Sequence, residues 1–209
     1  MKIPLALVSI LLFSIFSCSG DNQNKLEKKL ANENSPILLF FMKSDTSKAS
    51  KNLKSFSISG EYSHIGVLVK KSNSYLIYQV HPDYISGENF ITNVTIDEYL
   101  LSEKENLENF SIWELKSLNT EKFISELESI SNQKIKFDWN IDLTIDDYLY
   151  CSEYIYKILL KTDPIFRLKP KTILTPRLLS YTKKDSLKYI PVDFILQYKG
   201  CQLFYDSSN

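Results

Sequence analysis

FDWNIDLTIDDYLYCSEYIYKILL, from Phe137 to Leu160, is the stretch on which the interpretation of the whole chain depends. It starts as an extended aromatic segment, continues as a loop rich in Asn and Asp, and becomes a helix that opens at or just before Cys151. In this predicted helix Cys151 recurs at helical spacing with apolar side chains, namely Ile155, Ile158 and Leu159. We therefore expect the thiol to point the same way as the core-facing side chains.

The first turn of a helix is a favourable place for an anion. Its backbone N–H groups lack partners within the helix, and the helix dipole has its positive end there. Such a setting lowers the pKa of a thiol and favours a thiolate nucleophile. The same N–H groups can donate to an oxyanion. The position of Cys151 therefore predicts a cysteine nucleophile.

A cysteine nucleophile needs a base, and the chain contains only two histidines, His64 and His81. His64 begins a strand-like run that ends at Val69. This run and the segment Tyr75 to Val80 predict a hairpin joined over Lys71 to Ser74, in which Lys70 lies opposite Tyr75. The same register pairs His64 with His81.

Gln79 is the predicted third member of the site. In this register it shares one face of the hairpin with His64 and lies diagonal to it. An imidazole that accepts a thiol proton needs a polar partner on its other nitrogen, which fixes the tautomer and the ring direction. His81 is the alternative partner. Gly66 would leave the same face open to Cys151 or to a substrate.

The segment SHIGVLV at His64, followed by FDWN and then by YCSEYIYKIL at Cys151, resembles the YiiX/YaeF group of permuted papain-like amidases. These proteins are relatives of the NlpC cell-wall hydrolases. In them the histidine strand precedes the cysteine helix, as it does here over roughly Ile37 to Lys161. The resemblance implies an α+β, permuted papain-like fold in which an antiparallel sheet packs against the cysteine helix. The matching family strand usually ends in Glu-Ala, where this chain has Gln79-Val80.

Two other interpretations of Cys151 remain open at this stage. It can form a disulfide with Cys201, since an even pair is left once Cys18 is set aside, or it can be an inert buried cysteine. The neighbouring acidic residues are expected to cap the helix and fix the loop; they are Asp138, Asp142, Asp146 and Asp147. Glu153 lies about 200° around the helix from Cys151 and is predicted to be structural.

The N-terminal residues have the features of an export signal. Met1-Lys2 and the apolar run Ile3 to Phe16 have signal-peptide length. The following Ser17-Cys18-Ser19-Gly20 resembles a lipoprotein cleavage site. We predict a signal peptide over residues 1–17, acylation of Cys18, a polar tether over 18–35 and the domain over 36–209. Plain secretion or an uncleaved anchor is the alternative.

The length and composition agree with one well-packed α+β domain. Lys plus Arg and Asp plus Glu are balanced at 25 each, so the charge does not favour nucleic acid as a partner.

Further elements are expected outside the cysteine helix and the hairpin. They are a strand over Ile37 to Met42, a strand entering a helix over Val94 to Leu100, a strand over Phe110 to Leu115, and an amphipathic helix over Asn119 to Asn132.

The predicted function is that of a cysteine amidase. Cys151 would attack an acyl carbon, His64 would transfer the proton, and Gln79 would orient His64. No metal or organic cofactor is expected. The expected substrate is a peptide or acyl-amide, such as cell-wall peptide. We expect a monomer that is anchored in the cell envelope through Cys18 and faces the periplasm or exterior. The alternatives are a lipid acyl hydrolase or acyltransferase with the same dyad, and a non-catalytic surface lipoprotein.

Overall fold

The structure is a computed structural model that describes residues 25–33, 37–44, 53–72, 74–80, 91–133, 135–173 and 185–208. The chain divides into two units, Met1–Asn34 and Ser35–Asn209. In the first unit, residues 25–31 form a helix. The predicted signal peptide and Cys18 lie outside the described residues. Within the described ranges, no helix combines the length and the apolar character needed to cross a membrane.

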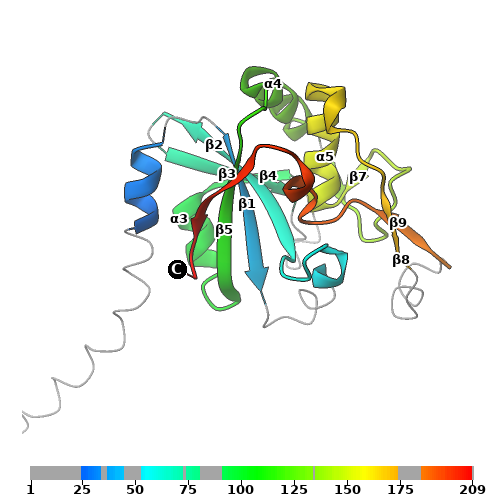
Figure 1. Cartoon of the computed structure of the whole chain (residues 1–209), viewed down its shortest axis with the longest axis horizontal. Coiled ribbons are helices and arrows are strands. Elements are labelled where there is room, and N and C mark those ends of the chain that lie inside the picture. Colours follow the sequence, from blue (N-terminus) through cyan, green and yellow to red (C-terminus); the bar gives the residue numbers. More distant parts are fainter. Residues whose placement is uncertain are drawn as a thin grey trace, which may run out of the picture. The chain divides into compact units, whose positions relative to one another are not determined.

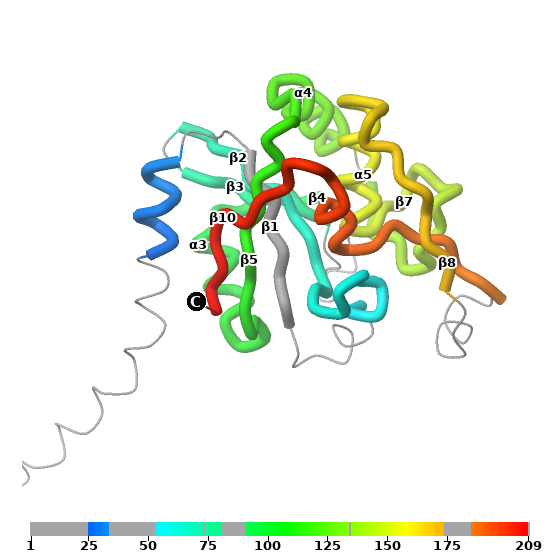
Figure 2. The backbone as a smooth tube through the Cα atoms, in the orientation of Figure 1, coloured from blue at the N-terminus to red at the C-terminus, as the bar shows by residue number. Residues whose placement is uncertain are grey.

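In the described part of the second unit, six strands form one antiparallel sheet in the order β10-β5-β1-β2-β3-β4 (Figure 1). The strand β10 pairs with β5 and forms one edge of the sheet (Figure 2). The expected strands in the first half of the domain are present. The bounds are β1 Ile37–Ser44, β2 His64–Lys71, β3 Ser74–Val80, β4 Ile91–Thr95, β5 Leu107–Leu115 and β10 Cys201–Asp206.

The hairpin of β2 and β3 has the predicted register. Lys70 pairs with Tyr75, as expected. Lys71 also pairs with Ser74, so the connection is shorter than predicted and consists of residues 72 and 73. Ser72 has a φ of 55°, which suits a tight hairpin connection of this length. His81, the alternative partner of His64, lies outside the described residues.

Three α-helices accompany the sheet in the described part of this unit: α3 Ile96–Ser102, α4 Thr120–Ser131 and α5 Cys151–Thr162. Helix α4 packs against α5, and α5 packs against β2 and β3 (Figure 1). The predicted amphipathic helix is confirmed as α4, whose buried residues are Phe123, Leu127 and Ile130. The apolar side of α5 contributes Ile155, Ile158 and Leu159 to the same core.

Short elements connect the helices to the rest of the unit. The two-residue strands β6 Lys136–Phe137 and β7 Tyr148–Leu149 are parallel, and β7 leads directly into α5. After α5, strands β8 Lys171–Ile173 and β9 Leu187–Tyr189 form an antiparallel pair. The described 3₁₀ helices are η1 Lys54–Phe56, η2 Pro164–Phe166 and η3 Phe194–Gln197.

Gly66 has a different role from the one predicted. A Cβ atom added at this position would lie 3.1 Å from Cγ2 of Ile77 and 3.3 Å from the carbonyl oxygen of Tyr78. The third nearest atom, Cβ of Gln79, also belongs to β3. The missing side chain therefore allows β2 and β3 to pack closely, and the expected opening towards Cys151 or a substrate is not what this geometry provides.

Gly66→Ala is expected to lower the free energy of unfolding by about 1–3 kcal/mol, because the added methyl group overpacks against Ile77 and the Tyr78 carbonyl. Urea denaturation followed by circular dichroism measures this loss. Ser129→Ala, at an exposed position of α4, is the control and should cause no loss beyond about 0.5 kcal/mol. Equal stability of Gly66→Ala and wild type would contradict the packing role.

Candidate active site

Helix α5 begins at Cys151, as predicted, but its start is fixed by unexpected partners. Tyr150 is the N-cap residue, and its side chain makes no capping hydrogen bond. Instead, the Tyr150 hydroxyl accepts a hydrogen bond of 2.7 Å from the backbone N–H of Ile190. Ser152 donates through Oγ to the carbonyl oxygen of Ile190, also at 2.7 Å. The prediction that aspartates cap this helix is therefore wrong, because long-range contacts to Ile190 hold its first turn.

The Cys151 thiol is buried and lies near three backbone donors. The N–H groups of Ile65, Ser152 and Cys151 itself face the sulfur. Burial nevertheless raises the pKa of the thiol to about 11, and these N–H groups offset only part of that rise. The expectation of a lowered pKa is therefore wrong for the thiol considered alone, because desolvation outweighs the helix terminus.

His64 and Gln79 are in contact at the end of the hairpin. Nε2 of His64 lies 2.8 Å from Oε1 of Gln79, and both side chains are buried. Because an amide oxygen only accepts, the neutral imidazole carries its proton on Nε2 and its lone pair on Nδ1. His64 also immediately precedes Ile65, whose N–H faces the Cys151 sulfur. The strand that begins with the histidine thus meets the helix that begins with the cysteine. The catalytic roles of the three residues stay predictions.

The alternative of a disulfide is contradicted by the structure. Cys151 and Cys201 are both free cysteines, the first at the start of α5 and the second at the start of β10. The thiol of Cys151 is therefore not bridged to Cys201. The Ile65 N–H beside it was not predicted from sequence, since a backbone group leaves no mark in the residue pattern.

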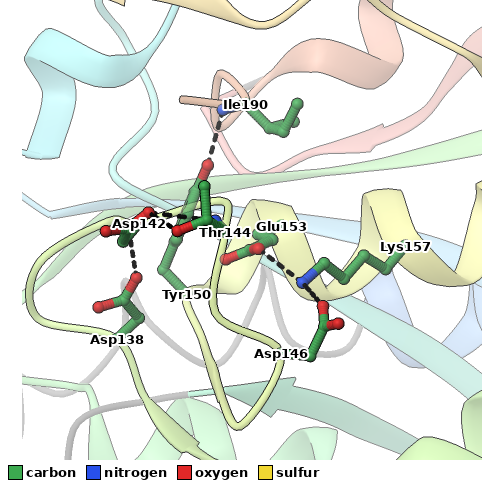
Figure 3. A network of polar contacts seen from close by, with 8 residues as sticks. All are labelled: Asp138, Asp142, Thr144, Asp146, Tyr150, Glu153, Lys157 and Ile190. Carbon is green, nitrogen blue, oxygen red and sulfur yellow. Dashed lines mark hydrogen bonds and ion pairs between the residues drawn. The ribbon is translucent and has the colours of Figure 1, made fainter. Parts of the chain in front are cut away.

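The loop before α5 is held by its own carboxylates (Figure 3). The buried Asp138 accepts hydrogen bonds from the backbone N–H groups of Asn140, at 2.8 Å, and Asp142. Ile141, between them, has a φ of 50°, a strained value for a β-branched residue. Asp142 in turn accepts from the N–H and the hydroxyl of Thr144, at 3.1 Å and 2.7 Å. The loop-fixing part of the prediction for these aspartates is confirmed.

Lys157 joins this loop to the cysteine helix (Figure 3). Its Nζ lies 2.8 Å from Oε1 of Glu153 and 2.6 Å from Oδ1 of Asp146. Glu153 is fully buried, whereas Asp146 belongs to the loop and is exposed. Burial raises the pKa of Glu153 to about 7 against the opposing effect of Lys157, and the nearby Asp138 adds to the rise. The contacts of Glu153 agree with the structural role that the sequence predicted.

Glu153 is expected to make stability depend on pH. Its pKa is about 7 in the folded chain against an ordinary value of 4.5, so the folded chain binds this proton more tightly. The resulting stabilisation is complete below about pH 4.5 and is lost as the pH rises through about 7. Glu153→Gln should therefore remove a fall in unfolding free energy, on the order of 1–3 kcal/mol, between about pH 5 and 8.

Urea denaturation over this pH range is the measurement. Asp146→Asn is the matched control, because Lys157 lowers the pKa of Asp146 and places its titration below this range. The control should therefore keep the slope of the wild type. An unchanged slope in Glu153→Gln would rule out this titration.

Comparisons with known proteins address the fold. No family model matches the chain, and no curated protein matches it. A solved structure does match, namely the crystal structure of metalloprotein yiiX from Escherichia coli O157:H7, DUF1105. The match has a TM-score of 0.59 and 12% sequence identity, and it covers 79% of this chain and 93% of that chain.

That protein is called a metalloprotein, which raises the question of a metal here. In the part of this chain that the structure describes, no three His, Cys, Asp or Glu side chains come together as ligands would. Both carboxylate oxygens of Asp138 accept backbone N–H groups. The described residues therefore do not fit a metal centre. What the comparison shows is the architecture: this α+β chain with its antiparallel sheet has a YiiX-like fold.

Proposed function

We propose that the chain is a cysteine hydrolase of permuted papain-like architecture that cleaves an amide bond. The observation that carries the proposal is the hydrogen bond from His64 Nε2 to Gln79. It assigns the lone pair to Nδ1 of a histidine whose neighbour, Ile65, faces the Cys151 sulfur. The YiiX-like fold supports the same assignment, because the resemblance of the two sequence motifs implies a histidine strand that serves a cysteine helix.

In the proposed reaction, the resting nucleophile is a neutral thiol. As the Cys151 sulfur attacks the acyl carbon, Nδ1 of His64 takes the thiol proton. The imidazolium then protonates the departing amine, which leaves a thioester on Cys151. His64 next removes a proton from water as the water attacks the thioester, and returns this proton to the sulfur as the acid leaves. A general-base step of this kind is consistent with a thiol whose pKa is raised to about 11.

The backbone around Cys151 supplies the proposed oxyanion site. The N–H groups of Cys151 and Ser152 belong to the first turn of α5, and they face the reacting sulfur together with the N–H of Ile65. Donors that are fixed in place before the reaction stabilise the charge that develops on the carbonyl oxygen. Their fixed position follows from the contacts of Tyr150 and Ser152 with Ile190.

The proposed substrate is a peptide or acyl-amide, and cell-wall peptide fits the predicted export. This part rests on the sequence: the signal-like N-terminus, the anchor at Cys18 and the resemblance to amidases related to NlpC. We propose a monomer in the cell envelope, facing the periplasm or exterior. The non-catalytic alternative would have been favoured by an oxidised Cys151–Cys201 pair, and both cysteines are free.

Labelling with iodoacetamide at neutral pH tests the dyad. Cys151 should react about tenfold or more faster in wild type than in His64→Ala, because without the base the reaction depends on a thiolate with a pKa of about 11. Peptide mass spectrometry gives the rate at each cysteine. Cys201 serves as an internal control, since burial raises its pKa to about 11 as well. Equal labelling of Cys151 with and without His64 would exclude the proposed hydrolase.

The role of Gln79 can be tested by changing whether its side chain can accept a hydrogen bond from His64. Gln79→Leu is expected to lower kcat/KM on an acyl-amide about 100-fold, because the imidazole loses the acceptor that fixes its tautomer. Gln79→Glu keeps an acceptor, so activity should stay within about tenfold of wild type. Its carboxylate should raise the pKa of His64 and move the acidic limb of the pH–rate profile to higher pH.

Gln202→Leu, at an exposed position of β10, is the matched control for the Gln79 variants. It should leave kcat/KM and the pH profile unchanged. A Gln79→Leu variant that retains full activity with an unchanged pH profile would show that Gln79 does not orient His64.

A further inference from the structure

The backbone of Ile190 is bound by the two residues that flank Cys151. Its N–H donates to the Tyr150 hydroxyl (Figure 3), and its carbonyl oxygen accepts from Oγ of Ser152, each at 2.7 Å. Ile190, Tyr150 and Ser152 are all buried. Hydrogen bonds are directional, whereas the apolar packing of α5 is not. These two bonds therefore fix where the first turn of α5 lies relative to Ile190.

Asp193 is a buried residue, 1% exposed, whose carboxylate binds a segment distant in the sequence. Its Oδ1 accepts from the N–H of Ile58 at 2.7 Å. Its Oδ2 accepts from the hydroxyl of Ser57 at 2.8 Å and from the N–H of Ser59 at 2.9 Å. An aspartate at the N-cap of a helix usually binds N–H groups of that helix, but Asp193 makes no such bond to η3. Both oxygens are used across the fold instead.

Two further contacts join the same stretches of chain. The N–H of Val192 donates to the carbonyl oxygen of Phe56 at 3.1 Å. The Tyr189 ring packs edge-to-face on the Phe56 ring, with centroids 5.0 Å apart. Residues 190–193, which we call the brace, are thus bound to the start of α5 at one end and to residues 56–59 at the other. Because three residue steps span at most about 11 Å, the brace keeps these two stretches close.

The brace completes a closed circuit that contains the candidate dyad. Residues 57–59 lead within a few residues to His64, and the N–H of the next residue, Ile65, faces the Cys151 sulfur. That sulfur belongs to the helical turn that is bound to the brace. The hairpin fixes His64 relative to Gln79, but pairing between two strands does not fix either residue relative to α5. The brace supplies this second constraint.

We propose that Asp193 is a positioning residue of the candidate active site: by holding residues 57–59 on the brace, it sets the separation between the His64 imidazole and the Cys151 thiol. This inference rests on the proposed function and adds to it a residue outside the dyad. Proton transfer requires hydrogen-bond reach, and a displacement of about 1 Å can cost about 100-fold in rate. Asp193 acts only through His64 in this role, and it takes no proton itself.

The role requires a carboxylate rather than an amide. A carboxylate accepts through both oxygens, whereas an amide accepts through its oxygen and donates through its nitrogen. In Asp193→Asn, the amide nitrogen would face the N–H of Ile58 or of Ser59, and that buried donor would lose its acceptor. The substitution keeps the volume of the side chain, so it changes the attachment of residues 57–59 and little else.

Iodoacetamide labelling of the full chain at neutral pH tests this role. Asp193→Asn should label Cys151 about fivefold or more slowly than wild type. Adding His64→Ala should then slow labelling by about twofold or less, against about tenfold in the wild-type background, because both substitutions remove the same proton transfer. A role in folding alone would leave the effect of His64→Ala at its full size in the folded fraction, which urea denaturation measures.

Asp163→Asn is the matched control for this substitution. Asp163 also accepts a backbone N–H, that of Ile165 at 2.9 Å, but it follows the opposite end of α5 from Cys151. The control should label Cys151 at the wild-type rate and keep the full effect of His64→Ala.

Ser57→Ala provides a second variant in case Asp193→Asn does not fold. It removes one of the three donors to Asp193 and leaves the N–H groups of Ile58 and Ser59 in place. It should slow the labelling of Cys151 by a smaller factor, and this slowing should disappear in the His64→Ala background. Wild-type labelling in a folded Ser57→Ala together with a folded Asp193→Asn would contradict the proposed role.

Amide hydrogen exchange tests the brace without chemistry at Cys151. The N–H of Ile65 should exchange about tenfold faster in Asp193→Asn, because local opening at the start of β2 is no longer restrained by the brace. The N–H of Leu127 in α4 should keep its wild-type rate. A general loss of stability would speed exchange at both positions.

The two measurements separate this inference from the proposed function. Labelling that does not depend on His64, together with faster exchange at Ile65 alone, would overturn the proposed function and retain Asp193 as the link between β2 and α5. The inference about Asp193 is overturned if His64→Ala has its full effect in Asp193→Asn. It is also overturned if Ile65 and Leu127 respond equally in the exchange experiment.

Discussion

The hydrogen bond between His64 and Gln79 requires one particular register between β2 and β3. Successive side chains of a strand point to opposite faces, so a slip of one residue between β2 and β3 would turn Gln79 away from His64. The pairing of Lys71 with Ser74 defines that register at the closed end of the hairpin, and Gly66 lets the strands approach closely enough to keep it. The tautomer of the imidazole, and with it the direction in which a proton can move, is therefore a consequence of hairpin geometry.

Two opposing effects act on the Cys151 thiol, and their magnitudes decide its resting state. A helix N-terminus favours an anion by about 0.3–1 kcal/mol at ordinary sites. The rise in pKa from 9.0 to about 11 corresponds to about 3 kcal/mol in favour of the neutral thiol. Burial therefore dominates, and in the proposed mechanism the N–H groups around the sulfur would serve the oxyanion that forms later. In that mechanism the base would have to act during the attack, so the orientation of His64 would matter more than it would beside a preformed thiolate.

Sequence reasoning succeeded where local patterns determine structure. Apolar periodicity located α4 and α5, and strand-like apolar runs located β2 and β3. The register between these strands followed from the expected connection, although the actual connection is shorter. Sequence reasoning failed where the partner is distant: the contacts of Tyr150 and Ser152 with Ile190 replaced the expected aspartate caps. It could not anticipate the parallel pairing of β6 and β7, since two-residue strands have no periodicity to read. The sign of the Cys151 pKa shift was also missed, because burial at a helix start depends on the whole fold.

The ion pairs of Lys157 with Glu153 and Asp146 serve to position the loop before α5. Cys151 and Ile155 belong to the core cluster, while Lys157 connects Glu153 to Asp146 in the loop that precedes α5. A buried carboxylate with one ion-pair partner contributes little net stability, because its desolvation offsets the attraction. An apolar pair of similar volume would fill the same space at no such cost, but it would not hold Asp146. The network therefore fixes the position of the loop relative to the first turns of the helix that begins at Cys151.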